Sequence, residues 1–284
     1  RLYDEPFADS AAIPTDRVCQ MARHHVTVAL SGDGGDESFA GYRRYRMHMG
    51  EELVRQRLPL GLRRPLRAKT SFQAMAMDAV QAYCHSVSHV RTGLRESLYS
   101  TSFKSQLGSY RALDLFRDHA LRARTQDPLA LMQYLDYKTW LVGDINTKVD
   151  RASMAHSLEV REPLMDHELI EWLATLPSRH KLRAGEGKAL FKKAFEPLLP
   201  NDVLYRPKMG FSVPLASWLR GPLAGRMRES VLSDRMADTG YFHRPTIGRL
   251  VDEHLGGRHD HSTVLWTLVM FDAFLRQSAA LELA

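Results

Sequence analysis

Cysteine is scarce in this sequence. Among 284 residues only Cys19 and Cys84 occur, and they do not form a Cys-x-x-Cys pair. A disulfide framework or a thiolate metal site needs more cysteines at closer spacings, so neither is supported. This usage is typical of a reducing, cytoplasmic compartment. No apolar run approaches the roughly 20 residues of a membrane-spanning helix, and the first residues lack the charged and then apolar pattern of a signal peptide.

Internal repeats and low-complexity tracts are also absent, and the composition is that of a globular protein. Apolar residues make up 44% and charged residues 25% of the chain, which is long enough for one large domain or two smaller ones. The net charge of +6 raises the question of an anionic partner. The densest basic stretch, residues 55–69, is broken by two prolines. We interpret it as a solvated basic loop rather than a nucleic-acid surface.

A strand, a glycine-rich turn and a helix are predicted near the start of the chain. Residues 26–30 are short, mostly apolar and rich in β-branched side chains, as in a strand buried on both faces of a parallel sheet. The turn follows at once, and residues 38–48 continue as a predicted helix. In this layout ligands bind at the carboxyl ends of the strands.

Most of the remaining chain shows the three- and four-residue apolar spacing of helices. Helices are predicted at residues 109–124, 128–145, 167–176, 187–200, 246–257 and 262–277, and a short one is predicted to begin at Thr15. Asp166 is the expected N-cap of the third of these helices, and the paired glycines 256 and 257 end the fifth. A single strand cannot form a sheet, so further strands are expected upstream of residue 1.

The glycine-rich turn combines backbone freedom with negative charge. Its glycines at 32, 34 and 35 can aim N–H groups into one concavity, which suits phosphate oxygens. Three carboxylates, Asp33, Asp36 and Glu37, would repel phosphate unless a cation lay between them. Magnesium, which binds one or two carboxylates together with phosphate oxygens, accounts for both features. An acidic turn with a purely structural role remains the alternative, since the motif is neither a Walker A loop nor a dinucleotide fingerprint.

The turn LSGDGGDESFAGYRRY, residues 30–45, resembles the SGEGxDExFxGY segment of the synthetase domain in glutamine-dependent asparagine synthetases. Two later stretches also resemble segments of this family. They are residues 148–172, KVDRASMAHSLEVREPLMDHELIEW, and residues 176–219. These segments occur in the family's order and span most of residues 1–220. The resemblance implies an α/β fold of the adenine nucleotide α-hydrolase-like class, present in part, with a mostly helical C-terminal portion. Residues 1–60 would belong to the sheet region and residues 61–284 to the helical portion.

The activity that the resemblance implies is that of an ATP-dependent amidotransferase, a carbon–nitrogen ligase. A carboxylate, aspartate in the first instance, is adenylated with release of pyrophosphate, and ammonia then displaces AMP to form an amide. ATP and Mg²⁺ would be the cofactors, and a glutaminase domain in the parent protein would supply ammonia from glutamine. Relatives that amidate a sugar or peptide carboxylate remain an alternative. A homodimer is left open, and neither a membrane nor a nucleic acid is an expected partner.

The resemblance assigns roles to residues of the glycine-rich turn. Asp36 matches the family's magnesium-binding aspartate. Asp33 stands where the family commonly has a glutamate near the reacting ammonia or substrate, and its shorter side chain could change the substrate accepted. Ser31, Gly32 and Gly34 match the backbone of the ATP site.

Lys188 matches a family lysine that approaches the α-phosphate or the adenylate. There a fixed ammonium offsets the charge that builds on the phosphate oxygens in the transition state. The alternative is a solvent-facing lysine on a helix. Arg161, and Asp150 with the neighbouring Arg151, are candidates for substrate binding, because the guanidinium group of an arginine fits a substrate carboxylate well. Buried ion pairs that fix the helical portion would explain the same residues.

The family's SGGxDS pyrophosphate loop does not occur in this sequence. Residue 1 is therefore expected to fall partway through a synthetase domain, and the chain alone is predicted not to turn over ATP. Two further hypotheses stay open. The chain could be a non-catalytic binding or assembly module of the same fold, or a basic helical protein that binds nucleic acid.

Overall fold

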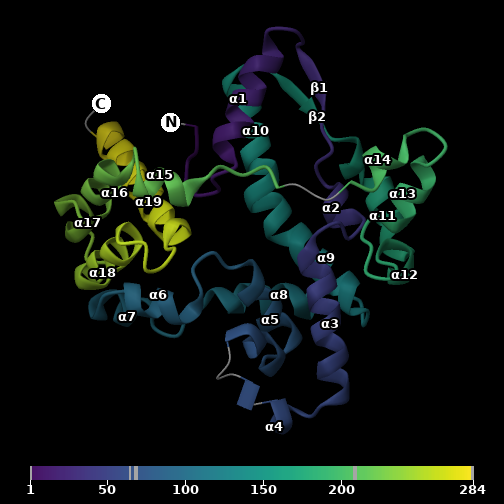
Figure 1. Ribbon diagram of the computed structural model, residues 1–284, viewed down its shortest axis with the longest axis horizontal. Coiled ribbons are helices and arrows are strands. Elements are labelled where there is room, and N and C mark those ends of the chain that lie inside the picture. The colour runs from purple at the N-terminus through teal and green to yellow at the C-terminus, as the bar shows by residue number, and fades with distance from the viewer. Residues whose placement is uncertain (1, 64, 67–69, 207–209, 283–284) are drawn as a thin grey trace. The chain divides into compact units, whose positions relative to one another are not determined.

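The computed structural model describes residues 2–63, 65–66, 70–206 and 210–282 (Figure 1). Contacts divide the chain into two compact units. The first comprises Arg1–Arg17, Ser88–Tyr110 and Phe211–Ala284, and the second comprises Val18–Val87 and Arg111–Gly210. These boundaries differ from the predicted division at residue 60. No helix in the described part of the chain combines the length and apolar character needed to cross a membrane.

The first unit is helical and has its own core. Its helices are α6 (Thr92–Leu98), α7 (Thr101–Leu107), α15 (Leu215–Arg220), α16 (Ala224–Val231), α17 (Asp234–Asp238), α18 (Arg244–Leu255) and α19 (Ser262–Glu282). Leu250 and Leu265 are fully buried at their centre. Asp272 is buried beside this core, where Arg235 and Arg276 donate hydrogen bonds to it and pair its charge. The predicted helices over residues 246–257 and 262–277 therefore correspond to α18 and most of α19.

The second unit carries the glycine-rich turn and the only described strands. Its elements are β1 (Val28–Leu30), α2 (Gly35–Ser38), α3 (Arg43–Arg57), α4 (Leu60–Arg63), η2 (Thr70–Ala76), α5 (Ala79–Val87), α8 (Ala112–Arg122), α9 (Pro128–Lys138), η3 (Leu141–Asn146), α10 (Thr147–Ala155), β2 (Glu159–Arg161), η4 (Pro163–Met165), α11 (His167–Thr175), α12 (Ser178–Lys181), α13 (Ala189–Phe195) and α14 (Asn201–Leu204). The described chain is thus mostly helical with one small sheet.

The sheet corrects the prediction of a lone strand. β1 pairs in parallel with β2, so that Val28 lies opposite Glu159 and Leu30 opposite Arg161. β2 was missed because its three residues, Glu-Val-Arg, carry two charges and do not form an apolar run. Burial on both faces was also wrong for β1 in this structure, since Leu30 is 74% exposed. The register places the turn after β1 next to the residues that follow β2.

Two helix boundaries near the turn differ from prediction. α1 (Ala12–Arg23), which contains the boundary between the units, begins before Thr15, whose hydroxyl donates to the carbonyl of Ala11. The helix predicted over residues 38–48 is interrupted, because α2 ends at Ser38 and α3 begins at Arg43. Ala40, in the interruption, has a φ of 57°. A left-handed residue cannot continue a right-handed helix, so the chain turns there.

The predicted helix over residues 167–176 is confirmed as α11, whereas the one over residues 187–200 forms only in part, since α13 runs from Ala189 to Phe195. The carboxylate of Asp166 accepts hydrogen bonds from the N–H groups of Glu168 and Leu169 and so caps α11. Residues 128–145 were predicted as one helix, but α9 ends at Lys138 and a π-helical turn, η3, follows. Such turns are rare and occur often at functional sites.

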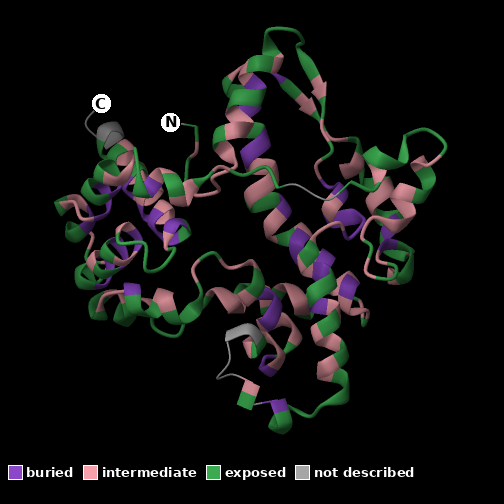
Figure 2. Ribbon diagram, viewed as in Figure 1, coloured by how far each residue is buried: buried purple, intermediate pink, exposed green. Residues whose placement is uncertain are grey.

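α9 lies at the centre of the second unit and packs against α2, α3 and α8. Its Met132 and Leu135 are fully buried with Tyr45 of α3 and Tyr83 of α5 (Figure 2). Asp136 of the same helix is also buried. α9 therefore offers buried polar groups as well as apolar ones to the elements around it.

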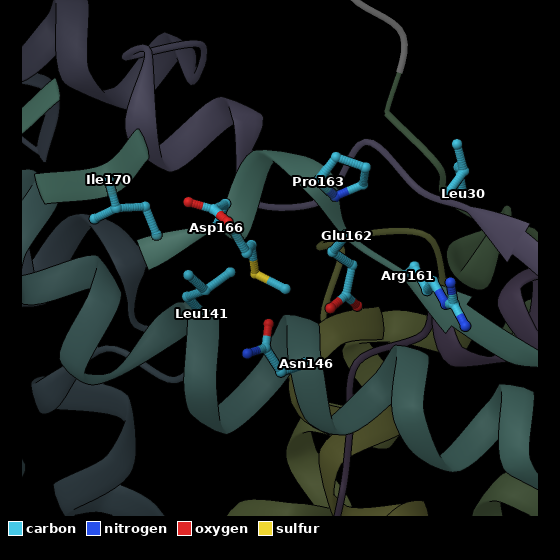
Figure 3. A pocket seen from close by; sticks show the side chains of 9 residues that line it. Leu30, Leu141, Asn146, Arg161, Glu162, Pro163, Asp166 and Ile170 are labelled. Carbon is cyan, nitrogen blue, oxygen red and sulfur yellow. The ribbon is translucent and has the colours of Figure 1, made fainter. Parts of the chain in front are cut away.

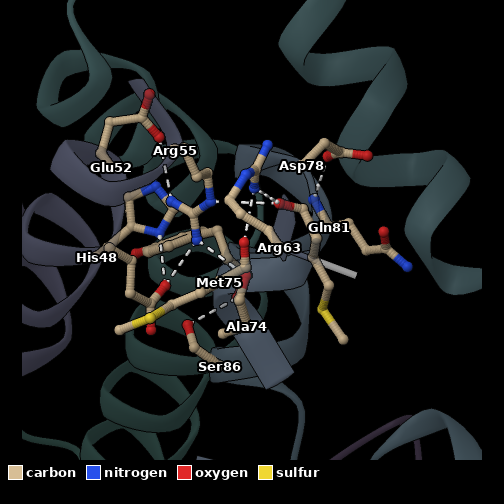
Figure 4. Close-up of polar contacts among 12 residues, drawn as sticks. His48, Glu52, Arg55, Arg63, Ala74, Met75, Asp78, Gln81 and Ser86 are labelled. Atoms are coloured by element: carbon tan, nitrogen blue, oxygen red, sulfur yellow. Dashed lines mark hydrogen bonds and ion pairs between the residues drawn. The ribbon is translucent and has the colours of Figure 1, made fainter. Parts of the chain in front are cut away.

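The interpretation of residues 55–69 as a solvated loop is wrong for two of its arginines. The side chain of Arg55 is 5% exposed and pairs with Glu51 at 2.7 Å. Arg63 is buried and donates to the carbonyls of Leu58 and Met75 (Figure 4). Carbonyls of an irregular segment need donors once they are buried, and guanidinium groups supply them here. Residues 64 and 67–69 lie outside the described residues.

Candidate active site

The structure brings Asp36 and Lys188 together. The Lys188 Nζ lies 3.0 Å from the Asp36 Oδ1, although the two residues come from α2 and from the position just before α13. The side chain of Lys188 is 29% exposed and that of Asp36 is 21% exposed, so the pair is partly shielded but reachable from solvent. Lys188 is therefore not the solvent-facing helix lysine of the alternative interpretation.

Close backbone contact holds this pair in place. The N–H of Lys188 donates to the carbonyl of Phe39 at 2.8 Å, and Lys188 has a φ of 57°. A Cβ at Gly187 would overlap the carbonyl of Ala40, which also has a φ of 57°. Non-glycine residues seldom adopt this conformation, and it persists where the surrounding structure imposes it. The two segments are thus locked against each other at the ion pair.

Gly41 leaves the space that the ion pair occupies. A Cβ at this position would overlap the Asp36 carboxylate and the Cε of Lys188. Gly35 is on the same side, where a Cβ would lie 3.8 Å from the Lys188 Nζ. Gly32 and Gly34 were predicted as site residues, whereas Gly41 was not, although Gly41 lies in the matched AGY segment. No atom approaches a Cβ built on Gly32 within 4 Å, so that part of the turn is open.

The glycine-rich turn is tied to the end of β2. The N–H of Ser31 donates to the carbonyl of Arg161 at 2.8 Å, and the Ser31 hydroxyl donates to the Asp33 carboxylate. Gly34 has a φ of 81°, and a Cβ there would overlap the side chain of Met165. The turn therefore rests on residues 161–165, while its other side faces Lys188.

Glu37 does not belong to the surface of the turn. It is 1% exposed, and the Tyr42 hydroxyl donates to its carboxylate at 2.6 Å. Burial raises the pKa of Glu37 above its ordinary value, against the lowering effect of the hydrogen bond from Tyr42. Of the three carboxylates that the sequence placed beside a cation, one thus points into the interior.

Two hollows open beside residues 159–166. The first has a volume of about 680 Å³ and is lined by Leu30, Leu141, Asn146, Arg161, Glu162, Pro163, Met165, Asp166 and Ile170 (Figure 3). The second, of about 550 Å³, is lined by Val142, Asn146, Thr147, Val149, Asp150, Arg151, Ser153, Met154, Glu159, Val160 and Glu162. Asn146 and Glu162 line both, so the two hollows adjoin.

The two predicted substrate-binding residues lie in these hollows and not at the ion pair. Arg161 lines the first hollow, and its side chain is 65% exposed and pairs with Glu159 at 2.6 Å. Asp150 lines the second hollow. Neither hollow is lined by Asp36 or Lys188. The candidate residues therefore form two groups, Asp36 with Lys188 and Arg161 with Asp150. The glycine-rich turn connects them, because Gly34 lies against Met165 of the first hollow.

Asn146 and Glu162, which line both hollows, were not predicted as site residues. Figure 3 shows the side chains of Glu162 and Asn146 pointing toward one another. Burial raises the pKa of Glu162, and the negative charges of Asp33 and Asp150 raise it further. The Asn146 Oδ1 is buried without a hydrogen-bond partner in the described structure. No sequence signal marks Asn146, whereas Glu162 could have been noticed as a charge directly after the Arg161 of a matched segment.

A metal ion would find few protein ligands at this site. The residues that the structure describes contain no group of three or more His, Cys, Asp or Glu side chains suited to hold one. Asp36 offers a single carboxylate. A cation bound there would need oxygen atoms from a second bound molecule, which is how magnesium is usually held beside phosphates.

Comparison with known proteins assigns the chain to a family. The asparagine synthase family model matches residues 1–276. Asparagine synthetase [glutamine-hydrolyzing] 1 of Bacillus subtilis is 33% identical over 95% of this chain and 43% of its own length. A putative asparagine synthetase [glutamine-hydrolyzing] of Mycobacterium tuberculosis strain H37Rv is 34% identical over 94% of this chain and 42% of its own length. The chain belongs to the asparagine synthase family, and it spans less than half the length of these relatives.

A more distant relative carries a different name. Amidase chyE of Penicillium rubens is 25% identical over 76% of this chain and 36% of its own length. The chain is thus similar to proteins that are named for different activities.

Proposed function

We propose that the protein to which this chain belongs is an ATP-dependent amidotransferase with an adenine nucleotide α-hydrolase-like fold. A carboxylate oxygen attacks the α-phosphorus of ATP, the bond to the β-phosphate breaks, and pyrophosphate leaves. Ammonia then attacks the acyl carbon, loses a proton, and displaces AMP to leave an amide. The observation that carries this proposal is the Asp36–Lys188 pair at 3.0 Å beside an open glycine-rich turn.

The Lys188 ammonium would bind the phosphate oxygens on which negative charge develops. The backbone of Lys188 is left-handed, and its N–H donates a hydrogen bond to the carbonyl of Phe39. Both features would hold the residue in place before the reaction, which is when a fixed charge is most effective. Asp36 would hold Mg²⁺ with one carboxylate, and the ion would neutralise phosphate charge when bound. Ser31, Gly32 and Gly34 would bind the nucleotide through the backbone of the turn.

The hollows at the end of β2 would receive the acceptor. Arg161 is exposed enough to exchange Glu159 for a substrate carboxylate, to which a guanidinium can donate two parallel hydrogen bonds. Asp33, Asp150 and Glu162 would give the same region a negative potential. Burial raises the pKa of Glu162, and the charges of Asp33 and Asp150 raise it further. That potential suits an ammonium group on the acceptor. An amino acid such as aspartate, with a carboxylate and an ammonium, fits both requirements.

A sugar or peptide carboxylate is the second candidate acceptor. Asp33 is shorter than the glutamate common in the family, and its carboxylate accepts a hydrogen bond from Ser31. This leaves more room at the turn than the family pattern does.

The nucleic-acid hypothesis loses part of its support, because Arg55 and Arg63 of the basic stretch are buried. Cys19 and Cys84 are buried thiols, and we place the reaction in the cytoplasm on that account.

Pyrophosphate release by the full-length protein tests this proposal. The protein would be given ATP, Mg²⁺ and one carboxylic acid at a time, with either ammonia or glutamine as nitrogen donor. We expect pyrophosphate, AMP and amide in equal amounts with one acceptor class. Production of ADP and phosphate, or an absence of amide across aspartate, sugar acids and peptides, would refute it.

A further inference from the structure

Helix α9 carries a buried amide between the two segments that supply Asp36 and Lys188. Gln133 is 3% exposed. Its Nε2 donates to the carbonyls of Glu37 and Ser38 at 2.5 and 2.9 Å. These carbonyls belong to α2, directly after Asp36, so both donors of one amide hold the segment that presents the carboxylate.

The other end of the same amide holds the segment that leads to Lys188. The Gln133 Oε1 accepts a hydrogen bond from the Lys181 Nζ at 3.1 Å. Lys181 is the last residue of α12 and is 3% exposed. A second bond attaches α12 to α9, since the Ser178 hydroxyl donates to the Asp127 carboxylate at 2.6 Å. One amide therefore contacts α2 with its nitrogen and α12 with its oxygen.

The segment between Lys181 and Lys188 is short and closed. Arg183 and Glu186 exchange two backbone hydrogen bonds, at 2.9 and 2.8 Å. The segment then passes Gly187, whose Cα hydrogen faces the carbonyl of Ala40, and reaches Lys188. A shift of α12 would thus be passed to Lys188 instead of being absorbed by a flexible loop.

Burial makes this arrangement sensitive to the amide. Lys181 has its ammonium inside the protein, where burial lowers its pKa, and Gln133 is its partner among the described hydrogen bonds. Without the amide, two carbonyls and one ammonium would lose partners that water does not replace without movement. The movement would occur in the two segments that form the ion pair.

We propose that Gln133 is a positioning residue that sets the geometry of the Asp36–Lys188 pair by holding α2 and α12 at once. The inference rests on the proposed function for its catalytic consequence, but its structural content does not. Gln133 is buried, and its hydrogen bonds go to α2 and α12. It acts through the placement of Lys188, and its replacement should therefore change the environment of the Lys188 amine as well as the rate.

Competitive amine labelling of the full-length protein tests the structural content. The acylation rate of Lys188 would be measured by mass spectrometry against that of exposed Lys104, in wild type, Gln133→Met and Lys181→Met. Separation of the ion pair frees the Lys188 amine and opens it to the reagent, so we expect Lys188 labelling to rise at least about threefold in both variants. Thr139→Val is the matched control. It removes a hydroxyl that donates within α9, to the carbonyl of Leu135, and should leave Lys188 labelling unchanged.

Steady-state kinetics test the catalytic consequence in the same variants. We expect kcat for pyrophosphate release to fall about 10- to 100-fold in Gln133→Met, with the KM for ATP within about twofold of wild type. If any substitution near this end of α9 impaired folding, the fraction of active protein would fall in Thr139→Val as well as in Gln133→Met. Wild-type protein that releases no pyrophosphate would refute the proposed function, while the labelling result would still decide this inference.

Two results would overturn the inference. One is wild-type labelling of Lys188 in folded Gln133→Met. The other, which applies if that variant does not fold, is wild-type labelling in folded Lys181→Met, since this variant keeps both bonds from Gln133 to α2. A Gln133→Glu variant separates the two contacts of the amide. It can still accept from Lys181 but has no N–H to donate to α2, so its labelling should stay above wild type.

Discussion

At the scale of single residues, Asp36 and Lys188 carry the proposed chemistry and are the first targets. Lys188→Met would remove the ammonium that contacts Asp36, so we expect kcat/KM for pyrophosphate release by the full-length protein to fall about 10²- to 10³-fold. Lys193→Met, one turn along α13 with a side chain 76% exposed, serves as the control and should be near wild type. Equal losses in the two variants would contradict the assignment of Lys188.

Gly41 offers a test that leaves the charges in place. In Gly41→Ala the new methyl group would overlap the Asp36 carboxylate and the Lys188 stem, so the pair must separate. We expect at least about a tenfold loss of kcat, as for other small displacements of reacting groups. Gly50→Ala in α3 is the control, because no atom lies within 4 Å of its Cβ and alanine favours a helix by about 0.5–1 kcal/mol. Full activity in Gly41→Ala would show that the pair is not needed.

His48 provides a prediction about pH. It is buried against Tyr83, and burial together with the charge of Arg55 lowers its pKa from 6.5 to about 4. The Glu51 carboxylate lies 3.9 Å from its Nδ1 and does not reverse this. The unfolded chain therefore binds a proton first as the pH falls. Stability from neutral His48 is fully present above pH 6.5 and is lost between about 6.5 and 4.

The difference corresponds to about 3 kcal/mol, and a His48→Leu variant should lack that part of the acid sensitivity. Urea unfolding from pH 7.5 to 4.5 would measure it as a difference between the two proteins. His254 also has a lowered pKa through burial, but it contributes equally to both curves. Parallel curves for wild type and His48→Leu would contradict the prediction.

At the scale of elements, α9 joins α3 and α5 through Asp136. The Asp136 Oδ2 accepts hydrogen bonds from Arg44 and Tyr83, both at 2.7 Å, and from the hydroxyl of Tyr45. The carboxylate is fully buried. Its loss would leave the Arg44 charge, which stacks on Tyr42, without a counter-charge.

Asp136→Ala should therefore lower the free energy of unfolding by about 3–5 kcal/mol, as when one partner of a buried ion pair is removed. Arg117→Gln is the comparison, because its pair with Asp78 is about half exposed on both sides and should contribute below about 1 kcal/mol. Denaturant unfolding of both variants would measure the contrast. Similar small losses would mean that apolar packing, not Asp136, holds these helices together.

The elements also show where sequence patterns succeed. Asp166 was predicted as an N-cap because it precedes an amphipathic helix, where its side-chain oxygen can accept a hydrogen bond from an N–H of the first turn. The structure confirms this cap. The predicted helix over residues 38–48 failed because its interruption depends on Ala40, whose left-handed backbone is imposed by contact with Gly187. A local pattern cannot report a contact made by a distant segment.

At the scale of the whole molecule, the described part of the chain leaves β1 with one partner strand and exposed apolar side chains. Val28 is 38% and Leu30 74% exposed. The sequence contains no SGGxDS loop, which is expected to hold pyrophosphate. Among the described residues, Asp36 belongs to no group of three or more side chains that could bind a metal ion. We therefore expect the 284-residue chain alone not to catalyse ATP–pyrophosphate exchange.

Exchange of labelled pyrophosphate into ATP, with Mg²⁺ and aspartate, would measure this. The full-length protein is the positive control and should exchange, while its Lys188→Met variant is the matched negative. Exchange by the 284 residues near the full-length rate would show that the residues around Asp36 and Lys188 suffice without an SGGxDS loop.

By itself, the sequence determined the family, through three ordered segments, and with it the choice of Asp36 and Lys188 as predicted site residues. Local patterns determined most helices, because amphipathic spacing and caps are short-range properties. The tertiary structure alone decided that Glu159–Arg161 is a strand, that Glu37 is turned inward, and that Gln133 bridges α2 and α12. Each of these depends on contacts between segments far apart in the chain, and neither a residue's type nor its neighbours specify which distant group will lie against it.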